Sequence, residues 1–255
     1  MKLKDKIAVV TGSGRGIGKG IALTFGREGA TVVVCSRTEK EMNRTVDEIR
    51  DMGGEAIGIS VDVTKEVEVE NLVKKVVEAY GRIDILVNNA GTTDPAFIDE
   101  MEESRWDKVL DTNLKGVFLC TKHILRVMKP NRSGKIITIA SDSGKSGTSE
   151  DSAYCSSKFG VLGFMESLTK EVLEYDISVS SILPGWVNTE LSKEVYSDEE
   201  LAEKGMPPMS EWIQPEQIGE LAVFLANVPN SLNIQELMVL STAEILYMKP
   251  ILDEV

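Results

Sequence analysis

The sequence predicts an α/β protein built on a doubly wound parallel sheet of about seven strands, with helices on both faces. Short apolar runs rich in β-branched residues, such as residues 7–11, alternate with amphipathic stretches at the pitch of β-α-β units. A cluster of glycines at 12–18 follows the first run and opens a helix. Crossovers between parallel strands are right-handed, which distributes the helices over both faces.

The strands are expected where apolar runs are short and bounded by turn residues. A run that is apolar throughout is typical of a strand buried on both faces, as in a parallel sheet. In chain order the expected strands are residues 7–11, 31–35, 55–63, 83–87, 135–140, 177–183 and 235–240.

The helices are expected where apolar residues recur with a period near 3.6. Val69, Leu72, Val73 and Val76 show this spacing, and Gly53-Gly54 stops the helix before them. Thr112-Asn113 and Gly116 should break the longest helix, and Pro130 should terminate it. In chain order the expected helices are residues 19–27, 39–52, 65–80, 104–129, 152–175 and 215–226.

Between Trp186 and Gln214 the composition shifts to Ser, Glu, Met and Pro. This composition favours a mobile lid over a pocket. Trp212 and Trp186 either line that pocket or pack the lid onto the body, and Met206 and Met209 are interpreted as apolar filler. No linker or repeat is present, so we expect one domain over residues 1–255, with the lid at about 186–214.

Charge and hydropathy exclude several partners. The formal net charge of −13 disfavours nucleic acid and anionic membranes, because both repel an acidic surface. No apolar run approaches the roughly 18 residues of a membrane span. The apolar run at residues 7–10 is shorter than the roughly seven residues of a secretory signal core. We therefore expect a cytoplasmic protein.

Cysteine and histidine are scarce. The chain has three Cys, at positions 35, 120 and 155, and one His, His123. This number and spacing indicate neither a disulfide framework nor a metal site. His123 is interpreted as an ordinary helix residue.

The glycine cluster follows a strand and precedes a helix, which is the context of a dinucleotide-binding turn. Glycines allow the backbone to approach a pyrophosphate, and the helix N-terminus offers N–H donors to phosphates. The alternative is a purely structural turn. The residues expected to bind phosphate are Gly12, Ser13, Gly14, Arg15, Gly16, Ile17 and Gly18.

The end of the second strand predicts a preference for NADP(H) over NAD(H). An Asp or Glu there usually binds the ribose 2′-hydroxyl of NAD. In this chain the strand runs into Ser36-Arg37-Thr38, and the next acid is Glu39. Arg37, with Arg15 from the glycine turn, could bind a 2′-phosphate. The alternative is that Arg37 is only a solvated loop residue.

Tyr154 and Lys158 form a candidate acid–base pair. They are four residues apart and share one face of a helix. A nearby ammonium favours the phenolate and should lower the pKa of the tyrosine. Such a tyrosine can exchange a proton with a carbonyl or an alcohol. Taken alone, this spacing is also common between an ordinary tyrosine and a solvated lysine.

Together these residues resemble the short-chain dehydrogenase/reductase family, and the likeness covers residue 5 to about 226. Within it, the stretch from Asn88 to Ser141 is most similar to 3-oxoacyl-[acyl carrier protein] reductases and related carbonyl and sugar dehydrogenases. The motifs are Thr11-Gly12-x-x-x-Gly16-x-Gly18, Asp62-Val63, Asn88-Asn89-Ala90-Gly91, Asn113, Ser141, Tyr154-x-x-x-Lys158 and Pro184-Gly185 with Thr189.

The resemblance implies a Rossmann-type fold and a role for each motif. Tyr154 is the general acid/base, Ser141 polarises the substrate carbonyl, and Lys158 holds the nicotinamide ribose. Asn113 anchors a water in the proton relay. It also implies that Asp62 meets the adenine, Asn89 lies along the adenosine ribose, and Val187 with Thr189 holds the carboxamide. The other cofactor-binding residues that it implies are Val63, Ala90, Gly91, Tyr154 and Lys158.

The C-terminus departs from the family pattern. The usual Asp-Gly-Gly turn is replaced by Ser241-Thr242-Ala243-Glu244 and an apolar-acidic tail. The resemblance implies a homo-oligomer, a tetramer or dimer, packed through the helices at 104–129 and 152–174. The altered C-terminus leaves its symmetry open.

The expected activity is hydride transfer between NADPH and a ketone or secondary alcohol. A 3-oxoacyl-[acyl carrier protein] reductase is one alternative, and it would need a basic patch for an acidic carrier. A sugar or polyol dehydrogenase is another, and a non-catalytic dinucleotide sensor is a third. Candidates for the patch, which could equally be solvated helix ends, are Arg126, Lys129, Arg132 and Lys170.

Overall fold

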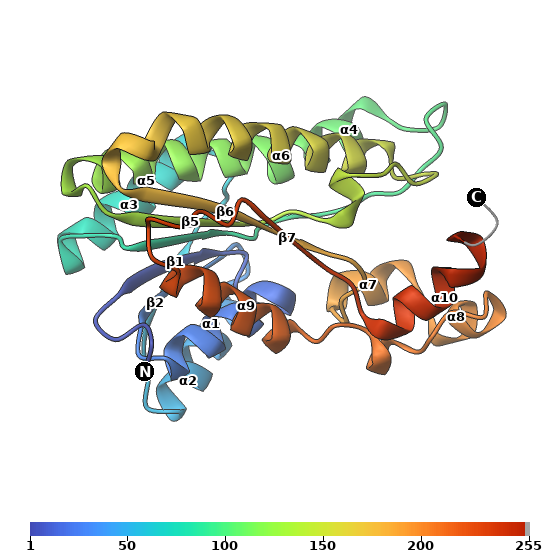
Figure 1. Ribbon diagram of the computed structural model, residues 1–255, viewed down its shortest axis with the longest axis horizontal. Helices are drawn as coiled ribbons and strands as arrows, with labels where there is room; N and C mark the ends of the chain where they lie inside the picture. Colours follow the sequence, from blue (N-terminus) through green and yellow to red (C-terminus); the bar gives the residue numbers. More distant parts are fainter. Residues whose placement is uncertain (253–255) are drawn as a thin grey trace.

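Within residues 1–252, which the computed structural model describes, seven strands form one parallel sheet (Figure 1). Their order is β3-β2-β1-β4-β5-β6-β7, so the direction of winding reverses between β1 and β4. The predicted doubly wound sheet is confirmed. The strands are β1 (Ile7–Thr11), β2 (Thr31–Ser36), β3 (Glu55–Ser60), β4 (Ile85–Asn88), β5 (Gly134–Ile139), β6 (Ile177–Pro184) and β7 (Glu236–Val239).

Two helical layers cover the sheet because its strands are apolar on both faces. In β1, Val9 belongs to the core on one face and Val10 to the core on the other. Figure 1 shows α3, α5 and α6 on one side of the sheet and α1, α2 and α9 on the other. These helices are α1 (Gly16–Arg27), α2 (Glu39–Asp51), α3 (Glu66–Tyr80), α5 (Gly116–Asn131), α6 (Ser152–Val172) and α9 (Pro215–Asn227).

The long helix predicted at 104–129 is three segments. α4 (Glu103–Leu110) passes through a π-helical turn at Asp111–Lys115 into α5, which confirms the expected break at Thr112-Asn113. The prediction that Pro130 terminates the helix is wrong, because Pro130 lies inside the last turn of α5. The helix ends one residue later, and Arg132 follows it in the left-handed conformation with φ 46°.

Residues 186–214 fold into α7 (Glu190–Val195), α8 (Asp198–Glu203) and a 3₁₀ turn at Met209–Glu211. Leu201, Met209 and Trp212 form a small buried cluster of their own. Trp212 and Met209 therefore pack inside this segment. This agrees with the filler interpretation of Met209, whereas Trp212 neither lines the cavity nor packs against the sheet and its helices, which were the two expected alternatives. Whether the segment moves as a lid stays a prediction.

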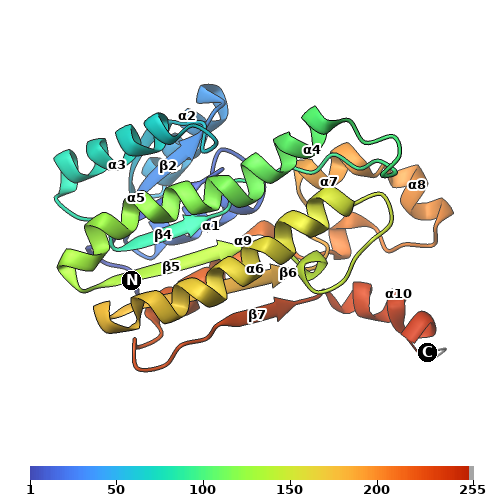
Figure 2. The same cartoon turned by 90° about the horizontal axis from the view of Figure 1, so that it is seen from above.

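The C-terminal tail contains a helix that the sequence pattern did not predict, α10 (Thr242–Leu252). In Figure 2 it continues beyond the end of β7. The Tyr247 hydroxyl donates to the carbonyl oxygen of Lys204 at 3.2 Å, so α10 is joined to the end of α8.

His123 and the three cysteines have structural positions. His123 is buried on α5 with its Nε2 3.0 Å from Glu66 Oε1. Cys35, Cys120 and Cys155 are buried and free of disulfides. Among the described residues, no group of three metal-ligating side chains could hold a metal ion. No helix within residues 1–252 is both long and apolar enough to cross a membrane.

Candidate active site

The glycine turn lies at the carboxyl end of β1, beside the point where the sheet reverses its winding. Gly12 has φ +62°, which L-residues with a side chain rarely adopt. The Asn89 side-chain amide donates to the carbonyl oxygens of Thr11 and Gly12, at 2.9 and 3.1 Å. A Cβ on Gly18 would lie 2.3 Å from the Asn89 amide nitrogen. The turn and the loop after β4 therefore form one close-packed unit.

The N-terminus of α1 opens into a cavity of about 400 Å³. Within the described chain, no side chain caps this end of the helix and no acid occupies its first turn. Its N–H groups are therefore open to a ligand, and their partial positive charge favours an anion. Gly14, Arg15 and Gly16 line the cavity here. This arrangement fits the pyrophosphate of a dinucleotide.

One end of the cavity lies beside the loops after β2 and β3. Arg37, Asp62 and Val63 line it. Burial raises the pKa of Asp62, but hydrogen bonds from Thr64 and the nearby Arg37 charge outweigh it, so the net pKa is lowered. Glu41, in the first turn of α2, also lines this end. Sequence reasoning missed it because it lies beyond the usual position of the ribose-binding acid.

Arg15 contacts the segment above the cavity. Its Nη1 lies 2.8 Å from Oε1 of Glu194 on α7. Both side chains are well exposed, so water screens the pair. The glycine turn and α7 are linked by this contact.

The other end of the cavity contains Ser141, Tyr154 and Lys158. Ser141 follows β5, and the other two lie on the first turns of α6. The pKa of Tyr154 is raised to about 12, because burial and the charges of Asp142 and Asp151, which raise it, outweigh a hydrogen bond with Ser141, which lowers it. The phenol is thus held in its protonated form.

Lys158 is 7% exposed, and its ammonium donates to the carbonyl oxygen of Ile139 at 3.0 Å. Burial lowers the pKa of Lys158 to about 8. Its Nζ lies 5.4 Å from the Tyr154 ring centroid. The expected lowering of the Tyr154 pKa by Lys158 is wrong for the protein alone, because burial of the phenol dominates.

Asn113 lies in the π-helical turn and bonds to two neighbours. Its Oδ1 accepts from the Thr92 amide at 2.8 Å, and its Nδ2 donates to the Thr92 carbonyl at 2.9 Å. Nδ2 also donates to Ser157 Oγ at 3.0 Å. π-helical turns occur often at functional sites. Here the turn joins the loop after β4 to the helix that contains Tyr154.

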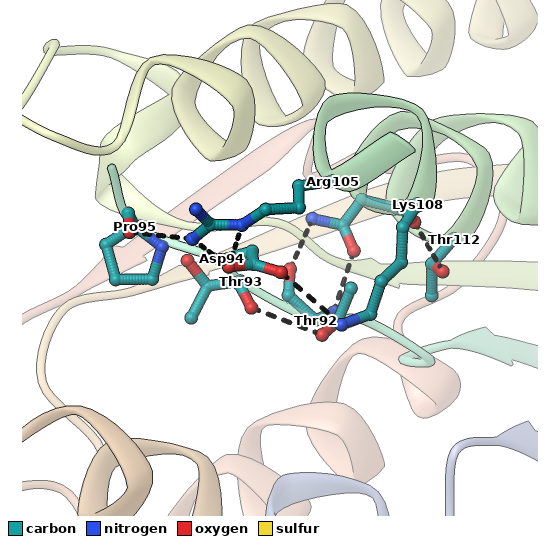
Figure 3. A network of polar contacts seen from close by, with 8 residues as sticks. Thr92, Thr93, Asp94, Pro95, Arg105, Lys108 and Thr112 are labelled. Carbon is teal, nitrogen blue, oxygen red and sulfur yellow. Dashed lines mark hydrogen bonds and ion pairs between the residues drawn. The ribbon is translucent and has the colours of Figure 1, made fainter. Parts of the chain in front are cut away.

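The loop after β4 is fixed by the network in Figure 3. Asp94 accepts from Nε of Arg105 at 2.9 Å and from Lys108 Nζ at 3.5 Å. Arg105 also donates to the carbonyl oxygen of Pro95 at 3.2 Å. These contacts attach the loop to α4, and the two hydrogen bonds between Thr92 and Asn113 attach it to the π-helical turn.

Most of the predicted site residues line the cavity, and three do not. Ser13 is buried below the turn, with its hydroxyl donating to the Val10 carbonyl at 2.6 Å. Gly18 and Asn113 support the site from outside. The sequence analysis missed several lining residues. Some lie at or just after the ends of strands, at the carboxyl edge of the parallel sheet, and the others lie on α2, the π-helical turn and α7. The missed residues are Ser36, Thr38, Glu41, Val61, Thr92, Thr112, Ile139, Ala140, Glu190, Leu191 and Ser192.

The candidate basic patch lies away from the cavity. Lys170 is about 18 Å farther along α6 than Lys158 at the rise of an α-helix, and it is paired with Glu166 at 2.8 Å. Lys129 lies 4.7 Å from the Tyr175 ring centroid, and Arg132 donates to the Glu174 carbonyl. Arg126 is exposed on α5. Within one chain, these cations do not line the reacting end.

The arrangement of sheet, glycine turn and Ser-Tyr-Lys group agrees with comparisons to known proteins. The model of the short chain dehydrogenase family matches residues 6–200, and the chain belongs to this family.

Several of its relatives are ketoreductases. The chain is 33% identical over 231 residues to the 3-oxoacyl-[acyl-carrier-protein] reductase FabG of Thermotoga maritima, covering 91% of this chain and 94% of the relative. It is 36% identical to the Synechocystis 3-oxoacyl-[acyl-carrier-protein] reductase, and the match covers 89% of this chain and 91% of the relative. The crystal structure of a single-residue variant of actinorhodin polyketide ketoreductase with NADPH superposes with a TM-score of 0.88 and 35% identity, covering 96% of this chain and 98% of that one.

Proposed function

We propose that the protein is an NADP(H)-dependent oxidoreductase that interconverts a ketone and a secondary alcohol, with Tyr154 as general acid/base. The observation that supports this most directly is the position of Ser141, Tyr154 and Lys158 in the same cavity as the open N-terminus of α1. A dinucleotide whose phosphates bind at α1 can extend to these three side chains.

When bound, the nicotinamide group supplies or accepts the hydride. The protein controls the proton. In reduction, negative charge develops on the carbonyl oxygen, where the hydroxyls of Ser141 and Tyr154 can donate hydrogen bonds. Tyr154 then transfers its proton to that oxygen. Its high pKa keeps the proton available at neutral pH.

Lys158 would hold the ribose of the cofactor and restore the proton of Tyr154. The side-chain amide of Asn113 donates both of its hydrogens, one to the Thr92 carbonyl oxygen and one to Ser157 Oγ. We therefore assign Asn113 to positioning α6, and its predicted part in a water relay stays a prediction.

The proposed preference for NADP(H) rests on Arg37 and Arg15, which line the end of the cavity nearest the β2 loop. Glu41 opposes them, because its carboxylate would repel a 2′-phosphate. With Asp62 also at this end, two guanidinium groups face two carboxylates. The proposed preference therefore rests on the charge-assisted hydrogen bonds that the guanidinium groups can donate to a phosphate, and not on net charge. The actinorhodin ketoreductase structure is with NADPH, which is consistent with this proposal.

We further propose that residues 186–214 act as a substrate lid on one domain. The base of this segment is joined by a parallel bridge between Val187 and Ile213. Its outer part contacts the body through the exposed Arg15–Glu194 pair, which a bound phosphate could replace. Opening would then turn about a fixed base.

A homo-oligomer is proposed through α5 and α6. Phe118 on α5 and Phe159 on α6 are 43% and 49% exposed, and burying such side chains favours association. Light scattering that gives the mass of a dimer or tetramer would support this, and a monomer at assay concentration would contradict it.

A 3-oxoacyl thioester is the second candidate substrate class, favoured by the relatives named 3-oxoacyl-[acyl-carrier-protein] reductase. The candidate basic patch lies away from the cavity of its own chain. A carrier protein would therefore have to reach the cavity without its help, unless another subunit places these basic residues nearby.

The deciding experiment follows the loss of NADPH absorbance with a β-ketoacyl thioester, a diketone, an aldehyde and a keto-sugar acid, with NADH in parallel. Turnover of the thioester alone favours the acyl reductase. Turnover of the other compounds with an inert thioester favours a general carbonyl or sugar reductase. No turnover with any of them, together with tight NADPH binding, would contradict the proposed activity and favour a dinucleotide sensor.

A further inference from the structure

Glu244 is a buried acid that the proposed reaction does not use. It lies in the first turn of α10 and is 1% exposed. Its backbone N–H donates to Ser241 Oγ at 3.0 Å, which fixes the start of the helix. Isolated carboxyl groups are rarely buried so fully, because burial costs free energy unless a partner compensates. The position of this side chain therefore needs an explanation.

The Glu244 carboxyl group contacts the loop that follows β6. Its Oε2 accepts from the Trp186 amide at 3.0 Å. A Cβ on Gly185 would lie 2.4 Å from both carboxyl oxygens, so the carboxyl group occupies the place of a side chain there. Gly185 also lines the cavity that contains Tyr154. Glu244 thus lies directly behind the wall of the candidate active site.

Aromatic packing extends this contact to the lid segment. The Trp186 ring lies 5.3 Å from that of Trp212 and 5.6 Å from that of Tyr247, measured between centroids. Trp212 in turn lies 6.1 Å from Tyr196. Trp186 is therefore held by Glu244 at its amide and by α10 and the lid segment at its ring.

Within the described residues, Oε1 of Glu244 has no hydrogen-bond partner. Burial raises the pKa of Glu244, hydrogen bonds from Trp186 and Ser241 lower it, and the charge of Asp142 raises it, with a net increase. Glutamine has nearly the same shape as glutamic acid and keeps an oxygen that can accept from Trp186.

We propose that Glu244 is a positioning residue that holds the Gly185–Trp186 wall, and with it the lid segment, in the arrangement that orients the carbonyl substrate beside Tyr154 and Ser141. The role would belong to the altered C-terminus of this chain. The inference rests on the proposed reductase activity.

The test compares Glu244→Leu with Glu244→Gln. Leucine removes the acceptor and leaves the Trp186 amide unpaired, so we expect a small fall in melting temperature with the protein still folded. We expect kcat/KM for the carbonyl to fall about 10–100-fold, the cost of a small misplacement of substrate. NADPH affinity should change little, because the Val187–Ile213 bridge and the cap that Thr189 forms with Ser192 hold the next residues independently. Glu244→Gln should stay near the parent in kcat and KM. Glu220→Leu, at an exposed position on α9, is the control for loss of an acid.

Equal kinetics of the Leu, Gln and parent proteins would overturn the proposal. The proposal would also be overturned if the loss of kcat/KM in Glu244→Leu were fully accounted for by a smaller fraction of folded protein. If this variant cannot be recovered folded, amide hydrogen exchange of the parent decides: slow exchange at Trp186 supports the contact, and exchange at the rate of an open loop overturns it. A parent without any turnover would contradict the proposed function instead, while the exchange rate would still test the contact.

Discussion

The ammonium nitrogen of Lys158 lies 3.0 Å from the carbonyl oxygen of Ile139, the last residue of β5. This hydrogen bond joins the base of α6 to the sheet directly under the reacting end of the cavity. It offsets part of the cost of burying the charged group, and the Tyr154 ring, 5.4 Å from the same nitrogen, adds to this. The consequence for stability depends on pH.

Burial lowers the pKa of Lys158 from 10.5 to about 8, so between these values the unfolded chain binds more protons than the folded one. Stability from this group therefore increases with pH from about 8 to about 10.5, by at most about 3 kcal/mol. Tyr154 has the opposite effect on stability, and at higher pH. Its pKa is raised in the folded protein, so the stability that it contributes is present below pH 10 and is lost as the pH rises through 12. Urea unfolding of the parent and of Lys158→Met between pH 7.5 and 10 measures the difference. A parent-minus-variant free energy that is constant over this range would contradict the prediction.

Tyr154→Phe should abolish most turnover while leaving NADPH binding intact. The substitution removes only the hydroxyl that transfers the proton, and general acid catalysis contributes about 10²–10⁴-fold. Steady-state kinetics and fluorescence titration with NADPH measure the two effects. Tyr80→Phe on α3, outside the cavity, is the matched control and should keep full activity. A Tyr154→Phe variant with parental kcat would refute the role of Tyr154.

Arg37→Ala should weaken NADPH binding about 10–100-fold, the value of one charge-assisted hydrogen bond. NADH binding should be unchanged, since it has no 2′-phosphate. Arg44→Ala on α2 is the control. Arg44 is 77% exposed and paired with Glu48, so its loss should leave the affinities for NADPH and NADH unchanged. Isothermal titration with each cofactor provides the measurement. Equal affinity of the parent for NADH and NADPH would rule out the proposed preference.

Gly18→Ala should disrupt the glycine turn. The added Cβ would meet the Asn89 amide at 2.3 Å and the Gly12 carbonyl oxygen at 2.4 Å, which forces the turn to shift. We expect a loss of stability of about 1–3 kcal/mol from overpacking and loss of cofactor affinity. Gly163→Ala in α6 is the control, because nothing lies within 4 Å of its added Cβ. Helix propensity predicts that this control gains up to about 1 kcal/mol. Normal NADPH binding by Gly18→Ala would show that the turn tolerates the methyl group.

The fold could be predicted because its signals are local. The β1 strand, the glycine turn and α1 lie within residues 7–27 and follow one another as the pattern indicates. The Tyr154–Lys158 pair is local too, because helical spacing alone places both on one face. The break before Gly116 was visible in sequence, but its π-helical form depends on the bonds of Asn113 to Thr92 and Ser157.

What the sequence did not predict depends on distant residues. The pKa of Tyr154 is governed by burial under the rest of the chain, which its neighbour Lys158 does not reveal. Arg15 meets Glu194, and Glu244 meets Trp186, across separations that no periodic pattern encodes. Pro130 usually signals the end of a helix, but the last turn of α5 accommodates it.

The three buried cysteines give the folded molecule a built-in reporter. Burial raises the pKa of Cys35, and it raises that of Cys120 to about 12. Maleimide and disulfide reagents attack thiolates, and they can reach these sulfurs only when the chain opens. The rate at which a reagent modifies the thiols therefore measures how often the protein opens from its native state, and no engineered label is needed. Addition of NADPH should slow that rate in proportion to its occupancy, which allows cofactor affinity to be measured even before a substrate is identified.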